Sequence, residues 1–147
     1  MNARRLIPLV LILLATVVPA CGPTDIITYI PEGGSYGADD LTALLASADL
    51  GKTASVTSEE VGETRQRALA QLRGHGDEAA ALADTLTSDF PPDLAAVPVL
   101  AQVATYEGEP AWIVIEATAD ESGTLSYRRL WVLSYDDRTV VAAQSAR

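Results

Sequence analysis

The chain has 147 residues and a formal net charge of −10, with 20 acidic residues against ten Lys and Arg. So acidic a chain repels nucleic acid and anionic headgroups, and we expect neither as a partner. It contains one cysteine and one histidine, which excludes an internal disulfide and leaves few ligands for a transition-metal site. We therefore expect no metal and no cofactor.

The N-terminus has the three-part layout of a secretory signal peptide. A head with two arginines precedes an apolar run over residues 6–18, and a small-residue exit ends at Ala20. The run is shorter than the roughly 20 apolar residues that a membrane-spanning helix needs, and Pro8 interrupts it. Residues 1–20 are therefore expected to be a cleaved signal peptide, with a membrane span as the weaker interpretation.

The tetrapeptide Val18-Pro19-Ala20-Cys21 resembles the bacterial lipoprotein signal, in which the cysteine becomes the lipid-modified first residue. This resemblance implies a diacylglycerol thioether on Cys21, often with a third acyl chain such as palmitate on its amine. The protein would then be anchored at the outer, extracytoplasmic face of the cell membrane. An ordinary signal peptidase would also cut after Ala20, leaving a free or intermolecularly paired thiol. The preference for arginine over lysine is common in GC-rich bacteria such as actinobacteria.

Residues 21–37 are expected to form the lipidated N-terminus and a tether, because they are rich in proline and glycine and contain the run GGSYG. The large apolar side chains between residues 26 and 30 do not suit a solvated tether. We therefore expect part of this segment to dock on the domain. The glycine run lacks the lysine and the preceding strand of a phosphate-binding loop, so no nucleotide is expected there.

Residues 38–147 are expected to form a single α+β domain, which begins with three helices. The first follows a capping Asp39 or Asp40 and stops at Gly51, the second begins at Thr57 with Glu60 completing a capping box, and the third follows Asp77 and ends at Pro91-Pro92. The short link Gly74-His75-Gly76 joins the last two into a helical hairpin. His75 is expected to be exposed at its tip.

From Val97 the hydrophobic period changes to two, which indicates strands. Four of them are predicted, over residues 97–106, 111–118, 124–134 and 139–144. Their short turns force antiparallel neighbours. The predicted fold is therefore α+β: a helical hairpin plus a short extra helix packed on a four-stranded antiparallel meander.

Counting across a four-residue loop at 120–123 sets Trp112 opposite Trp131 and separates two faces of the sheet. One face carries Val97, Val99, Val103, Trp112, Val114, Trp131, Leu133 and Val140, and we assign it to the helices. The other carries Leu100, Tyr106, Ile113, Ile115, Leu130, Val132 and Val141, diluted by Gln102. Either residues 26–30 and the first helix cover this second face, or it is an open surface for a partner. In the second case the candidate partner-binding residues are Tyr106, Ile113, Ile115, Leu130 and Val132.

Residues that could carry chemistry are few. No GxSxG elbow and no calcium-binding loop occur in the sequence. The pairs Asp120-Glu121 and Asp136-Asp137 are expected to serve as turn residues, and Glu116 is expected to form a structural ion pair with Arg129. No catalytic residue is predicted, and we do not expect an enzyme.

Two functions remain open. The first is a lipid-anchored interaction module that offers a sheet face or edge to another protein of the cell envelope. The alternative is a carrier lipoprotein that holds a lipid or another small apolar ligand in a cavity between the sheet and the helices. The stretch TYEGEPAW, residues 105–112, and the strands after it are similar to extracytoplasmic domains of small actinobacterial membrane proteins and lipoproteins of unassigned function. That resemblance implies no activity.

Overall fold

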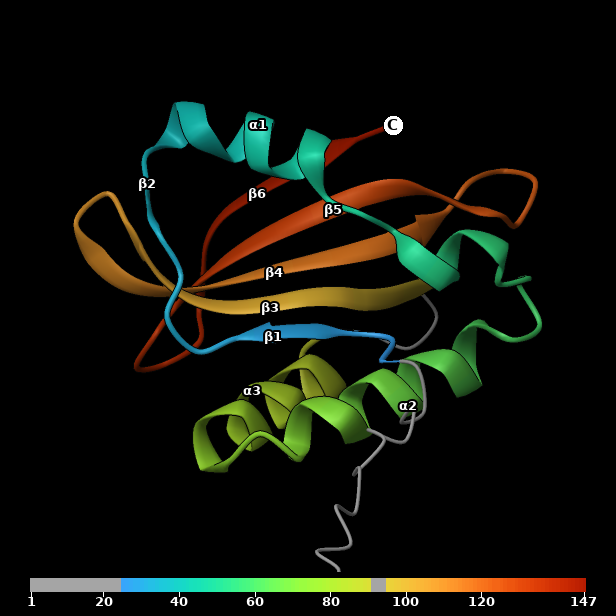
Figure 1. Ribbon diagram of the computed structural model, residues 1–147, viewed down its shortest axis with the longest axis horizontal. Helices are drawn as coiled ribbons and strands as arrows, with labels where there is room; N and C mark the ends of the chain where they lie inside the picture. Colours follow the sequence, from blue (N-terminus) through green and yellow to red (C-terminus); the bar gives the residue numbers. More distant parts are fainter. Residues whose placement is uncertain (1–24, 91–94) are drawn as a thin grey trace, which may run out of the picture.

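The computed structural model describes residues 25–90 and 95–147 (Figure 1). The expected signal peptide, Cys21 and the Pro91-Pro92 pair lie outside the described residues. Within them the chain forms three α-helices, one 3-10 helix and a six-stranded, mostly antiparallel sheet. The α+β class predicted from the sequence is therefore confirmed, although its details differ. No helix in these two ranges is long and apolar enough to cross a membrane.

Helices dominate the first half of the chain and long strands the second. In chain order the elements are β1 (Thr28–Ile30), β2 (Ser35–Tyr36), α1 (Ala38–Ser47), the 3-10 helix η1 (Gly51–Ser55), α2 (Val61–Arg73), α3 (Asp77–Ser88), β3 (Ala96–Tyr106), β4 (Glu109–Ala119), β5 (Leu125–Ser134) and β6 (Val140–Ala146). The long strands begin where the hydrophobic period changes from helical to two.

Each predicted helix is present, but each begins away from its predicted start. Gly37 precedes α1, and its N–H donates to Asp40 Oδ2 at 2.7 Å. The N–H and the hydroxyl of Thr57 donate to Glu60 Oε2 at 3.1 and 2.9 Å, but this closes a turn ahead of α2. Gly76 precedes α3 with a φ of 115°, a conformation that favours glycine. Asp40 and Glu60 therefore stabilise the backbone at and just before the starts of α1 and α2.

The sheet has the order β1-β3-β4-β5-β6, with β2 also paired to β3. Strands β3 to β6 are antiparallel neighbours in chain order, as their short turns predict. The predicted four-stranded sheet is incomplete, because β1 and β2 add to the other side of β3 as parallel strands. Part of the expected tether thus belongs to the sheet, and Ile27 beside it is only 3 % exposed.

The α2–α3 hairpin packs on the face that carries the two tryptophans, as predicted, and α1 lies on the other side of the sheet (Figure 1). Arg65 of α2 bonds Glu116 of β4, and Phe90 meets Trp131 of β5 edge-on, with ring centroids 4.9 Å apart. The tryptophan face, as we call it below, carries Val103, Trp112, Val114, Glu116, Trp131 and Leu133.

Helix α1 covers the opposite face, so of the two alternatives left open by the sequence, cover by the first helix is the one found, and the open surface is not. Leu41 and Leu45 of α1 are each 1 % exposed, and Thr42 Oγ1 donates to Gln144 Oε1 of β6 at 3.2 Å. The isoleucine face, as we call it, carries Leu100, Gln102, Ile113, Ile115, Leu130 and Val132. Four of the candidate partner-binding residues have no exposed surface: Ile113, Ile115, Leu130 and Val132. Only Tyr106 keeps partial exposure.

The predicted register between β4 and β5 is wrong by two residues. Trp112 pairs with Leu133, and Trp131 pairs with Val114. The loop is longer than expected because β5 begins only at Leu125, and a bulge follows near Ser126. A slip of two residues leaves the β5 side chains beyond the bulge, from Tyr127 to Leu133, on their predicted faces, since the side-chain period of a strand is also two.

A bulge in β3 also changes two of the face assignments. An irregularity between Pro98 and Leu100 pairs Val97 with Ala117, which places Val97 on the isoleucine face instead of the tryptophan face. Val99, within the irregularity, was predicted on the tryptophan face but lines a cavity on the isoleucine face. Val140 pairs with Leu133 on the predicted side, but it is 52 % exposed and lies outside the core.

Candidate functional site

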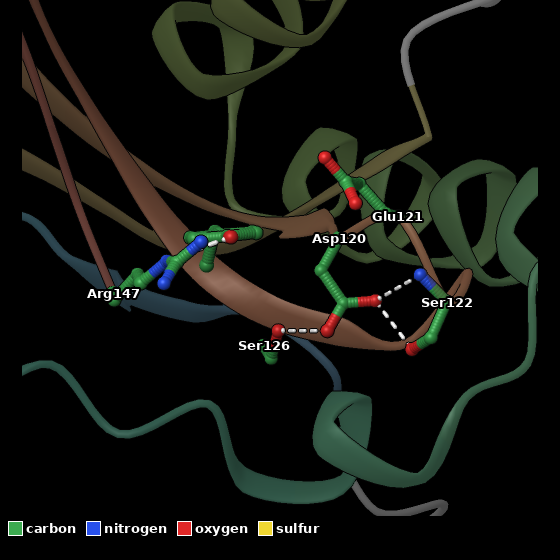
Figure 2. Close-up of a pocket in the computed structure, with 6 residues that line it drawn as sticks. Asp120, Glu121, Ser122, Ser126 and Arg147 are labelled. Atoms are coloured by element: carbon green, nitrogen blue, oxygen red, sulfur yellow. Dashed lines mark hydrogen bonds between the residues drawn. The ribbon is translucent and has the colours of Figure 1, made fainter.

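A shallow pocket at the β4–β5 turn is built on Asp120 (Figure 2). Its Oδ1 accepts hydrogen bonds from the N–H and the hydroxyl of Ser122 at 2.8 and 2.5 Å, and its Oδ2 accepts from Ser126 Oγ at 2.7 Å. These bonds lower the pKa of Asp120 to about 2. Since the turn itself occupies both oxygens, Asp120 acts as a turn residue, as predicted.

Arg65 and Glu116 form a buried ion pair between α2 and the sheet. Arg65 Nη1 donates to Glu116 Oε1 at 2.9 Å, and Trp131 Nε1 donates to Glu116 Oε2 at 2.9 Å. The guanidinium also donates to the carbonyls of Leu86 and Ala96 at 2.8 and 3.0 Å. All of these hydrogen bonds are made to other groups of the domain, so we interpret the ion pair as structural.

The predicted ion pair between Glu116 and Arg129 is wrong. Arg129 is the direct cross-strand neighbour of Glu116, but its guanidinium lies over the ring of Trp131, 5.5 Å from the centroid. Arg65, which is 51 residues away in the sequence, reaches the carboxylate instead. Sequence reasoning missed Arg65 because its position depends on how α2 docks on the sheet.

His75 is exposed at the tip of the α2–α3 hairpin, as predicted. Its ring stacks on Tyr29 of β1 with centroids 4.6 Å apart. Burial raises the pKa of Tyr29, and the nearby Tyr135 and Glu78 add to the effect. No group of three or more side chains that could hold a metal ion occurs within residues 25–90 and 95–147. We interpret His75 as a packing residue that holds the hairpin tip against β1.

Strand β6 forms one edge of the sheet, and we call Val140–Ala146 the β6 edge. These seven residues include no charge and no proline, and Val140 and Val141 are 52 % and 56 % exposed. No described residue makes a backbone hydrogen bond to the outer side of this strand. An uncharged strand of this length with a free row of N–H and C=O groups is a template for pairing with another extended chain.

A cavity of about 400 Å³, which we call the edge pocket, opens beside the start of the β6 edge. Its apolar wall comes from Tyr106, Pro110, Ala111 and Val141. Tyr106 is the one predicted partner-binding residue that reaches it. The cavity volume is in the range of small-ligand sites and is also large enough for one long side chain.

Three carboxylates line the edge pocket: Glu107, Glu109 and Asp136. Glu107 Oε1 accepts a hydrogen bond from the N–H of Ala38 at 2.7 Å and so supports the start of α1. The side chains of Glu109 and Asp136 make no hydrogen bond or ion pair to any residue of the described ranges. The edge pocket therefore presents two unpaired negative charges next to an apolar wall, an arrangement that suits a cation with an apolar stem.

The sequence contained part of the signal for this site. Alternate turns of a meander lie at the same end of the sheet, so the turns after β3 and after β5 bring Glu109 and Asp136 together. From the sequence alone, Asp136 is expected only as a turn residue, and Glu109 has no expected role. Acidic residues in two turns at the same end of a predicted meander indicate that their side chains lie close together.

We compared the chain with known proteins and found no relative. No protein-family model, no curated protein and no solved structure matches the chain.

Proposed function

We propose that this chain is an exported, lipid-anchored binding module of the cell envelope that binds an extended, basic segment of another envelope protein and catalyses no reaction. The observation that carries the binding role is the open β6 edge beside a pocket with two unpaired carboxylates. The anchor is supported by the signal-like residues 1–20 and by Cys21.

Strand addition is the binding mode that the β6 edge favours. A segment that pairs with β6 gains main-chain hydrogen bonds, which depend little on its sequence. Its side chains alternate between the two faces of the sheet, so every second one points to the side where Val141 lines the edge pocket. Backbone pairing would supply affinity, and the pocket would supply specificity.

The charges favour a basic partner over a second copy of the chain. Two copies that paired through their β6 edges would each carry a net charge of −10, so charge repulsion between the chains disfavours this pairing. A lysine or arginine can bury its aliphatic stem against Tyr106 and Val141 while its charge meets the carboxylates. The other edge is less suitable, because β1 and β2 have only three and two residues.

A synthetic peptide tests the binding role. The full chain, held in phosphatidylcholine nanodiscs, is titrated with a labelled peptide of four Val-Lys repeats, and binding is followed by fluorescence anisotropy. The double variant Glu109→Lys, Asp136→Lys should weaken binding about tenfold or more, because each reversal sets like charges against each other. The matched control Glu59→Lys, Glu63→Lys makes the same change in net charge at exposed positions near α2 and should shift the affinity by less than about twofold.

The same peptide with methylated backbone nitrogens separates strand pairing from simple charge attraction. Methylation removes the donors for the β6 edge but keeps every lysine, so binding should be lost. Equal binding of both peptides, or equal weakening by the control variant, would contradict the proposal. A dimer in sedimentation that Val141→Lys abolishes would make a second copy the occupant instead.

The anchor has its own test. Cys21→Ala should move the protein from the membrane to the soluble or secreted fraction, or leave it as uncleaved precursor. Mass spectrometry of the wild-type N-terminus gives the direct answer. An unmodified thiol there, or retention of residues 1–20, would overturn the lipoprotein half of the proposal.

A further inference from the structure

A second cavity, of about 340 Å³, lies on the isoleucine face between α1 and strands β1 and β3. Apolar side chains dominate its walls, among them Ile30, Leu44, Val99, Leu100 and Ile115. We call it the helix groove. It is separate from the edge pocket, with which it shares no lining residue. The sequence-based expectation of a cavity placed it below the helices on the tryptophan face, so its position on the isoleucine face is new.

Gln102 is the unusual residue of the helix groove. It is only 3 % exposed, yet its Nε2 has no hydrogen-bond partner among the described residues. The strand connection above it is tight: a Cβ on Gly33 would lie 2.6 Å from the carbonyl oxygen of Val103 and 3.1 Å from Gln102 Oε1. Leaving a buried amide donor unpaired is costly, and such a group normally has a partner in the working molecule.

We propose that the helix groove binds a neutral, mostly apolar small molecule whose carbonyl or ether oxygen accepts a hydrogen bond from Gln102 Nε2. The amide turns easily about its last side-chain torsion, so it can face the cavity without a change in the backbone. The apolar walls would bury the body of the ligand, and the single donor would orient it. One well-placed polar group in an apolar cavity is the usual composition of a small-molecule site.

Size and charge define the ligand class further. One water molecule takes about 30 Å³ of liquid volume, so the groove has space for roughly ten non-hydrogen atoms. Asp49 lines the groove, and its Oδ1 accepts a hydrogen bond from Gly51 N at 2.7 Å. Arg128 donates to the carbonyl of Ala48 but does not line the groove. An anionic ligand would therefore meet a carboxylate and no lining cation, which favours an uncharged ester, amide or ether.

Three probes of equal chain length test this class: methyl nonanoate, nonanoate and nonane. Each is added to the full chain in phosphatidylcholine nanodiscs, and thermal unfolding is followed by tryptophan fluorescence. A ligand that binds only the folded state raises the melting temperature. Methyl nonanoate should give the largest rise and bind about fivefold more tightly than nonane, because the ester offers Gln102 an acceptor and nonane offers none. Nonanoate should give the smallest rise.

Two variants identify the site, and a third controls for the glutamine-to-leucine change itself. Gln102→Leu should melt at the same or a higher temperature without ligand, because an unpaired donor is replaced by an apolar group, and it should lose the advantage of the ester over nonane. Leu44→Trp should fill the groove and abolish the response to all three probes. Gln66→Leu, the same change at an exposed position of α2, should behave as wild type.

Several outcomes would overturn the proposal. If wild type shows no response to methyl nonanoate, or if Leu44→Trp keeps it, the ester does not bind in the groove. If Gln102→Leu melts clearly lower and keeps its preference for the ester, the amide has a structural role. A larger response to nonanoate than to the ester would indicate an anion site and contradict the ligand class.

Discussion

The two faces of the sheet are covered in different ways. On the tryptophan face, polar contacts join the α2–α3 hairpin to the strands, since Arg65 and Glu116 are linked at 2.9 Å and Trp131 binds the same carboxylate. On the isoleucine face, α1 packs through Leu41 and Leu45, and a cavity remains beside Leu44. One face is fixed by directional bonds, whereas the other is held by apolar packing with space left over.

This difference separates stability from binding. Buried charges need correct partners, so the tryptophan face specifies how the hairpin docks. Apolar packing is non-directional and tolerates a gap more easily, at a cost that grows with the size of the gap. We therefore expect changes on the tryptophan face to unfold the domain, and changes around the helix groove to alter binding at a smaller cost in stability.

The largest effect is expected from Glu116→Ala. This change leaves the Arg65 guanidinium buried without its carboxylate, which should lower the free energy of unfolding by about 3–5 kcal/mol. Urea denaturation measures it. The double variant Arg65→Met, Glu116→Leu should recover most of the loss, because a well-packed apolar pair can replace a buried ion pair.

An exposed ion pair on the same hairpin supplies the control for that experiment. Arg73 Nη2 lies 2.9 Å from Asp84 Oδ1, but these side chains are 40 % and 72 % exposed. Asp84→Ala should therefore cost no more than about 1 kcal/mol. If Glu116→Ala cost as little as Asp84→Ala, the tryptophan face would not be the directional, stability-determining side.

A smaller effect is expected from α1, where two adjacent leucines separate packing from the groove. Leu45 is 1 % exposed, and Leu45→Ala should lower the free energy of unfolding by about 3 kcal/mol. Leu44 is half-buried on the groove wall, and Leu44→Ala should cost about 1 kcal/mol. Urea denaturation compares the two. Equal losses would mean that Leu44 is packed as tightly as Leu45 and that the groove is not a real gap.

Hydrophobic periodicity was sufficient to predict the three helices, the antiparallel run of long strands and the face on which the hairpin docks. It also placed Trp112 and Trp131 correctly despite a wrong register, because a slip of two residues preserves the face. Bulges interrupt this period-two pattern. The irregularity beyond Pro98 moved Val97 to the other face, and no single-sequence pattern marked it.

The candidate sites were harder to predict, because each depends on contacts between distant segments. Glu109 and Asp136 meet only through the order of the strands, and Gln102 becomes a buried, unpaired donor only once β1 and α1 are in place. In the sequence, Gln102 is recognisable only as a polar interruption of an apolar face. Whether such a residue is solvated, paired or left as an open donor depends on what covers the face, and local pattern does not contain that information.

The smallest effect on stability is expected at the β4–β5 turn. This turn lies outside both faces of the sheet, so a change there shows how much a surface hydrogen-bond cluster contributes. The pKa of Asp120 in the folded chain, about 2, is below its ordinary value of 3.8, chiefly because Ser122 and Ser126 donate to the ionised carboxylate. The stabilisation is therefore complete above about pH 4 and is lost as the pH falls towards 2. Asp120→Asn should lower the melting temperature slightly at pH 7, and the difference from wild type should shrink to nothing near pH 2. Glu121→Gln, a change at the exposed neighbour without a hydrogen bond among the described residues, should show no such convergence. A difference that stays constant from pH 7 to pH 2 would mean that the carboxylate charge does not stabilise this turn.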